Sequence, residues 1–163
     1  MVTNQIEPEK YRELVTMAKT FTAKLHKTDK EKVHNITLGG DKTTDVCPPP
    51  DMDKHDGATS PHHLFLSSIG GCVNLVFDIA LQKGHIEFSN ITSEISGEYV
   101  TDEDTQRSAF ESISIDTTVT VPKDANETRI KKLFDMAKDN CPIGNCLIGS
   151  CVKLVTNLNI EYE

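Results

Sequence analysis

One segment of the chain, residues 61–83, is apolar on nearly every side of the helix that it predicts. Ser60 is a suitable N-cap, Pro61 is at the first helical position and Gly84 follows the last. A helix that is apolar all round is normally buried, and at about 1.5 Å per residue this one would cross a whole domain. Gly70 and Gly71 interrupt it, so we expect either a bend or a closely approaching backbone at that point.

Three segments precede this helix. Glu7–Ala18, within residues 1–19, carries apolar positions at helical spacing and predicts a short N-terminal helix. Alternating apolar and polar residues predict a hairpin over residues 20–38. Residues 39–60 hold three consecutive prolines and an acidic run, which predict a long loop containing neither strand nor helix.

The remaining segment, residues 89–163, is richer in strands. Two alternating stretches joined by an acidic turn predict an antiparallel hairpin. Asp124, three residues before Glu127, resembles a capping box and predicts the start of an amphipathic helix, and a last strand closes the chain. We therefore expect residues 1–163 to form one α+β domain with helices against a mostly antiparallel sheet.

Composition narrows the range of functions. Lys plus Arg total 17 against 25 for Asp plus Glu, and the net charge is −8 without any basic block, so nucleic acid is not an expected partner. The polar N-terminal ten residues do not resemble a secretory signal. We expect a cytoplasmic protein that does not bind membranes.

Five cysteines do not suggest a disulfide framework, because the number is odd and the chain is long enough to build a core. Cys141, Cys146 and Cys151 recur every five residues, unlike zinc ligands, and no metal site is expected. Cys47 is a loop thiol without a visible partner. Cys72, inside the apolar helix, is either a small core residue or a functional thiol, and its position alone leaves both open.

The segment Ser60-Pro61-His62-His63-Leu64-Phe65-Leu66-Ser67-Ser68-Ile69-Gly70-Gly71-Cys72, followed much later by Cys141-Pro142-Ile143 and a terminal strand, resembles the OsmC/Ohr family. The family comprises osmotically induced and organic hydroperoxide resistance proteins. The resemblance implies an intertwined homodimer, with antiparallel sheets around two long central helices and active sites at the subunit interface.

The resemblance also implies an activity, the reduction of organic hydroperoxides in oxidative stress defence. Cys72 matches the peroxidatic cysteine and Cys141 the resolving cysteine, with Cys146 open as an alternative. A hydroperoxide would oxidise Cys72 to a sulfenic acid, Cys141 would condense with it, and an external dithiol would reduce the disulfide. No metal or organic cofactor is required.

The chain departs from the family pattern in the groups that would stabilise a thiolate. Family members use an arginine from an N-terminal strand, oriented by a glutamate after the helix proline. Here that position is His62, and the arginines are Arg12, Arg107 and Arg129. We therefore hypothesise that His62 or His63 lies near Cys72. The alternative function is a non-catalytic dimeric protein that binds a small apolar or acyl ligand.

Overall fold

The computed structural model describes residues 19–163, and the chain divides into two compact units, one ending at Ser60 and the other running from Pro61 to Glu163. The N-terminal helix predicted at Glu7–Ala18 lies outside the described residues.

The first unit contains a three-stranded antiparallel sheet of β1 (Ala23–Lys27), β2 (His34–Leu38) and β3 (Lys42–Val46), followed by the 3-10 helix η1 (Pro49–Lys54). Strands β1 and β2 confirm the predicted hairpin. The prediction of a featureless loop over residues 39–60 is wrong, because this segment supplies both β3 and η1.

Two local features explain why β3 and η1 form in this segment. Gly39 and Gly40 have φ values of 46° and 63°, which let the chain reverse and pair β3 with β2. The prolines stand at the start of η1, where their fixed φ suits a helical turn and their missing N–H groups are not needed. The glycines and prolines thus bound elements instead of breaking them.

The second unit begins with the predicted central helix, α2 (Pro61–Lys83). Residues at a spacing of four form its buried face, namely Ile69, Val73, Phe77 and Leu81. The opposite side is also apolar but open, since Leu75 is 66% exposed and Ile79 is 50% exposed. In the single chain the helix is therefore buried along one face rather than all round. The length and apolar composition of α2 would also suit a membrane span, but core helices of soluble proteins meet the same two criteria.

The sheet of this unit has the order β4-β5-β6, with β4 at Asn90–Thr101, β5 at Ser108–Val121 and β6 at Lys153–Tyr162. β4 and β5 form the predicted antiparallel hairpin. β6 differs from the antiparallel sheets that the resemblance implied, because it runs parallel to β5. Parallel neighbours need a crossover connection, and α3 (Glu127–Asp139) and α4 (Pro142–Asn145) provide it.

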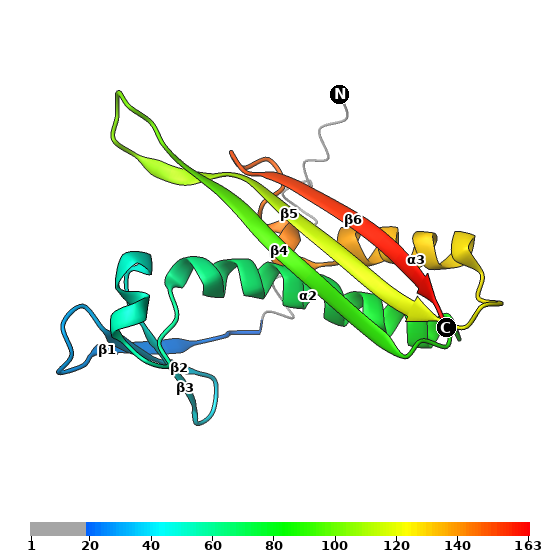
Figure 1. The fold of residues 1–163 in the computed structure, drawn as a ribbon, viewed down its shortest axis with the longest axis horizontal. Helices are drawn as coiled ribbons and strands as arrows, with labels where there is room; N and C mark the ends of the chain where they lie inside the picture. Colours follow the sequence, from blue (N-terminus) through cyan, green and yellow to red (C-terminus); the bar gives the residue numbers. More distant parts are fainter. Residues whose placement is uncertain (1–18) are drawn as a thin grey trace. The chain divides into compact units, whose positions relative to one another are not determined.

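Helix α3 starts two residues later than predicted. Its N-cap is Asn126, whose side chain accepts a hydrogen bond from the Arg129 amide at 3.0 Å, and not Asp124. Helices α2 and α3 lie side by side against one face of the sheet (Figure 1), and Phe77 meets Phe134 edge-to-face between them. The core of this unit therefore lies between two helices and one sheet, an α+β arrangement as predicted.

The two glycines of α2 have different roles. A Cβ atom at Gly70 would overlap the Ile95 side chain of β4, whereas one at Gly71 would meet no atom within 4 Å. Gly70 therefore permits the close approach of helix and sheet that its position predicts. That approach brings the middle of α2, where Cys72 lies, close to the sheet formed by β4, β5 and β6.

Candidate functional site

The thiols of Cys72 and Cys141 meet. The Cys141 Sγ donates a hydrogen bond to the Cys72 Sγ, and the two atoms are 2.7 Å apart. Cys72 comes from the middle of α2, while Cys141 follows α3 and is the N-cap of α4. The structure therefore brings together the two residues that the resemblance singled out, although both remain thiols.

Cys141 is held by the short helix that it caps. Its sulfur accepts a hydrogen bond from the Gly144 amide at 3.2 Å, and a Cβ atom at position 144 would lie only 3.3 Å from that sulfur. Pro142 suits the first position of this helix because its fixed φ and missing N–H cost nothing there. The Cys-Pro-Ile-Gly sequence thus fixes the direction in which the Cys141 thiol points.

The two cysteines differ in exposure. Cys141 is completely buried, while Cys72 is partly accessible. Burial raises the pKa of the Cys141 thiol to about 11, and its hydrogen bond to Cys72 adds to this, while the Gly144 amide acts in the opposite direction. Near neutral pH Cys141 keeps its proton, which it donates to the sulfur of Cys72.

His62 stands in the first turn of α2, far from the cysteine pair. Its ring packs edge-on against Tyr99 at 5.0 Å and Phe110 at 5.9 Å between ring centroids. Ten residues of helix separate it from Cys72, about 15 Å along the axis. Its buried Nδ1 has no hydrogen-bond partner among residues 19–163.

His63 is nine residues before Cys72, about 14 Å along the helix axis and half a turn round from it. Within one chain, neither histidine therefore lies beside Cys72. Arg107 is in the turn between β4 and β5, Arg129 is in the first turn of α3, and Arg12 lies outside the described residues.

The other thiols have separate surroundings. Cys47 is buried in the first unit and donates to the Thr59 carbonyl at 3.8 Å. Cys146 is exposed and donates to the Pro142 carbonyl at 3.3 Å, and Cys151 is exposed as well. Of the two candidates for the resolving cysteine, Cys141 is the one in contact with Cys72. In the part of the chain that the structure describes, His, Cys, Asp and Glu form no group of three suited to a metal ion.

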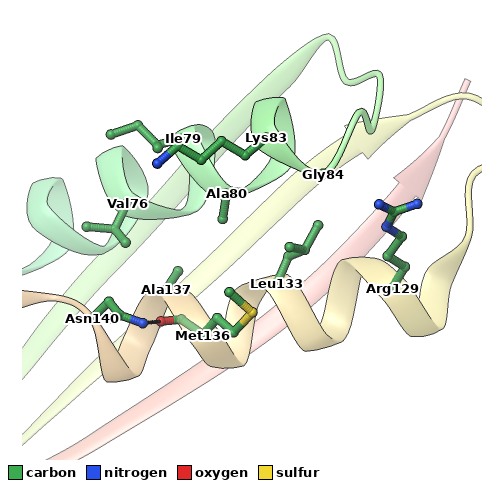
Figure 2. Close-up of a pocket in the computed structure, with 10 residues that line it drawn as sticks. All are labelled: Val76, Ile79, Ala80, Lys83, Gly84, Arg129, Leu133, Met136, Ala137 and Asn140. Carbon is green, nitrogen blue, oxygen red and sulfur yellow. Dashed lines mark hydrogen bonds between the residues drawn. The ribbon is translucent and has the colours of Figure 1, made fainter.

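A pocket of about 560 Å³ lies between α2 and α3, and sequence reasoning missed it. Its lining, shown in Figure 2, comprises Val76, Ile79, Ala80, Lys83, Gly84, Arg129, Leu133, Met136, Ala137 and Asn140. At one end it is one helical turn from Cys72 on α2 and adjoins Cys141 through Asn140. The helical spacing of these side chains was visible in the sequence, but the pairing of α2 with α3 was not.

The fold and the cysteine pair define a class of protein, which comparison with known families and solved structures identifies. The family model described as "OsmC-like protein" matches residues 54–157, well over half of the chain. The chain therefore belongs to the OsmC/Ohr family. The match includes all of the second unit up to Asn157 in β6, and both cysteines fall within it. No curated protein matches the sequence.

Solved structures of low sequence identity share the fold. An OsmC-like protein from Mycoplasma pneumoniae has a TM-score of 0.76 at 17% identity, covering 90% of this chain and 100% of that one. The organic hydroperoxide resistance protein OhrB of Bacillus subtilis has a TM-score of 0.61 at 19% identity, covering 86% and 98%. An organic hydroperoxide resistance protein from Elizabethkingia anophelis has a TM-score of 0.66 at 14% identity, covering 90% and 99%.

Proposed function

We propose that this protein is a thiol-dependent peroxidase that reduces organic hydroperoxides in oxidative stress defence. The observation that carries the proposal is the 2.7 Å contact between the Cys72 and Cys141 sulfur atoms. Membership of the OsmC/Ohr family supports it, as do structural neighbours that are named organic hydroperoxide resistance proteins.

Cys72 is the peroxidatic residue in this proposal because it is the more accessible of the two thiols. Its thiolate attacks the distal oxygen of the hydroperoxide, the O–O bond breaks, and the alkoxide takes up a proton and leaves as an alcohol. Cys72 becomes a sulfenic acid. The hydrogen bond from Cys141 favours this step, since a donor stabilises negative charge on the Cys72 sulfur.

Cys141 is the resolving residue. Its sulfur attacks the Cys72 sulfenic acid, an S–S bond forms, and water leaves with the Cys141 proton. A disulfide has an S–S length of about 2.05 Å, so the two sulfur atoms need to move by less than about 1 Å. An external dithiol then reduces the disulfide by thiol–disulfide exchange, returning both residues to thiols.

Consumption of cumene hydroperoxide in the presence of dithiothreitol tests the proposal. Wild type is expected to turn over, and Cys72→Ser to fall to the uncatalysed rate. Cys141→Ser should form a sulfenic acid that dimedone traps at Cys72, while the matched control Cys146→Ser should behave as wild type. Consumption that persists in Cys72→Ser would rule out the peroxidatic assignment.

We further propose that the protein works as a homodimer, as its family resemblance implies. The open side of α2 supports this proposal, because Leu75 is 66% exposed and Ile79 is 50% exposed. Gly71 lies on the same side, one turn before Leu75, and a Cβ atom there would meet no atom within 4 Å. Large apolar side chains gathered on one helix face are typical of an interface. A second copy of α2 packed there would remove them from water.

A ligand-binding role without catalysis is the second candidate. It is favoured by the pocket beside the cysteine pair and by the absence of arginine and histidine next to Cys72 on α2. The same assay separates the two functions, since a wild-type protein that consumes no hydroperoxide supports the binding role.

A further inference from the structure

Cys141 stands at a junction between two helices. Helix α3 ends at Asp139, α4 begins at Pro142, and the Cys141 backbone between them is extended, with φ at −75° and ψ at 106°. Helix α4 has only four residues, and a helix of one turn is not stable without support from its surroundings. The direction of the Cys141 thiol therefore depends on what fixes α4 relative to α3.

One side chain joins the two helices across this junction. The Asn145 Nδ2 atom donates a hydrogen bond to the Asp139 carbonyl oxygen at 3.1 Å, and within residues 19–163 this is the one hydrogen bond between α4 and α3. Asp139 is the last residue of α3, so its carbonyl has no partner within that helix. The bond closes residues 139–145 into a loop, and Cys141 lies within that loop.

Asn145 also holds Cys141 through its backbone. The Asn145 N–H donates to the Cys141 carbonyl at 2.9 Å, and the N–H of the preceding Gly144 donates to the Cys141 Sγ at 3.2 Å. Any movement of α4 is therefore passed on to both the backbone and the sulfur of Cys141. The residue that fastens α4 to α3 thus also controls where the Cys141 Sγ lies, which is 2.7 Å from the Cys72 Sγ.

We propose that Asn145 is a positioning residue for formation of the Cys72–Cys141 disulfide, acting through the placement of α4. The inference rests on the function proposed above, because it concerns the step in which the Cys141 sulfur attacks the Cys72 sulfenic acid. That step forms an S–S bond and releases water, and its rate depends on how often the two sulfur atoms are aligned. Without the bond from Asn145, Cys141 spends less of its time facing Cys72.

The exposure of Asn145 separates this role from a contribution to the core. Its side chain is exposed, so Asn145→Ala removes the tether without opening a cavity, and circular dichroism should show an unchanged fold. One hydrogen bond of this kind changes an equilibrium by roughly two- to tenfold. Because the bond acts on a single junction, its loss should appear at Cys141.

The first measurement needs no hydroperoxide. Equilibration with mixtures of reduced and oxidised dithiothreitol gives the equilibrium constant of the Cys72–Cys141 disulfide, with the bonded cysteines identified by mass spectrometry. In Asn145→Ala this constant is expected to fall roughly two- to tenfold, because a looser Cys141 loses more freedom when the bond forms. Asn145→Asp is nearly the same size but donates no hydrogen bond at neutral pH, and it should lose as much.

A matched control removes a comparable hydrogen bond elsewhere. The Asn157 side chain is also exposed and donates one hydrogen bond, to the Asp116 carboxylate at 2.7 Å, on the sheet. Asn157→Ala should keep the wild-type disulfide equilibrium, since this bond does not touch the junction between α3 and α4.

The second measurement follows the reaction itself. After one equivalent of cumene hydroperoxide, dimedone traps the Cys72 sulfenic acid, whose lifetime should lengthen in Asn145→Ala roughly two- to tenfold. In the Cys141→Ser background, the added Asn145→Ala should leave the rate of Cys72 oxidation unchanged. A general loosening of the fold would slow that oxidation in both backgrounds.

The outcomes separate the positioning role from the peroxidase. An unchanged disulfide equilibrium in Asn145→Ala would overturn the positioning role, as would slower Cys72 oxidation in Asn145→Ala/Cys141→Ser. A wild-type protein that consumes no hydroperoxide would refute the peroxidase, whereas the expected fall in the disulfide equilibrium would still support the positioning of Cys141 by Asn145.

Discussion

Gly70 of α2 and Ile95 of β4 approach so closely that a Cβ atom at position 70 would overlap the Ile95 side chain. The neighbouring Gly71 faces open space. This contrast between two adjacent glycines fixes which side of α2 lies on the sheet. It also orients Cys72, two residues further along the helix, toward the Cys141 side.

The first prediction follows from that contrast. Gly70→Ala should lower the free energy of unfolding by about 1–3 kcal/mol, because Ile95 must leave its rotamer to make room. Gly71→Ala should raise it by up to about 1 kcal/mol, because alanine is the better helix former. Urea denaturation of both variants in the Leu75→Glu background, in which the proposed dimer should not form, checks the two signs. Equal effects of the two substitutions would contradict the packing.

The second prediction concerns a hydrogen-bonded chain of three polar side chains between α2 and the sheet. Ser93 donates to Asn74 at 2.6 Å and shares a hydrogen bond with the buried Thr117 at 2.8 Å. Ser93→Ala should cost about 1–3 kcal/mol, because it leaves Thr117 without this partner. Ser96→Ala, at an exposed position of the same strand, should change the unfolding free energy by less than about 0.5 kcal/mol. Similar losses of unfolding free energy in both variants would mean that the hydrogen-bonded chain does not stabilise the fold.

The third prediction is a pH dependence set by Cys141. An unfolded chain loses this proton near pH 9 and the folded chain near pH 11, so the folded state binds more protons between these values. Stability should therefore be intact below about pH 9 and fall as pH rises to about 11, by on the order of 2 kcal/mol. Thermal unfolding of wild type and of Cys141→Ala, measured under reducing conditions between pH 9 and pH 11, isolates the part of the stability loss that Cys141 causes. An equally steep decline in Cys141→Ala would assign it to other groups.

The fourth prediction concerns the histidines. Because His62 is about 15 Å from Cys72 along α2, His62→Ala should leave the pH profile of Cys72 alkylation unchanged. It should still destabilise the fold through its lost contacts with Tyr99 and Phe110. His63→Ala should likewise leave the profile unchanged. A shifted profile in either variant would mean that a histidine reaches the cysteine from a second copy of the chain.

The fifth prediction tests the homodimer. Leu75→Glu places a charge in the open apolar face of α2 and should convert a dimer to a monomer in sedimentation velocity experiments, since a buried unpaired carboxylate is costly. Gln106→Glu adds the same charge in the exposed turn between β4 and β5, away from α2 in sequence, and should leave association unchanged. A wild-type protein that sediments as a monomer at all concentrations would refute the dimer.

Much of the candidate site was accessible from the sequence. The Gly-Gly-Cys motif and the later Cys-Pro indicated both cysteines through a family resemblance, and the structure brings their sulfur atoms into contact. The separation of His62 from Cys72 was also implicit in the predicted helix, because its rise per residue places ten residues about 15 Å apart. The hypothesis that His62 approaches Cys72 overlooked this consequence of the helix itself.

Other features depended on contacts between distant segments. The strand β3 forms because two glycines turn the chain back onto β2, and β6 is parallel to β5 because two helices carry the chain across. Neither pairing partner can be identified from the alternation of one strand. The pocket likewise exists only because apolar side chains of α2 and α3 face each other.

By itself, the sequence determined the elements that local periodicity and end signals specify, above all α2, its glycine pair and the place of Cys72 on it. Only the tertiary structure decided that Cys141 loses its contact with water, faces Cys72 and holds its proton to about pH 11. The physical reason is that helix signals act over a few residues, whereas desolvation depends on everything that packs around an atom.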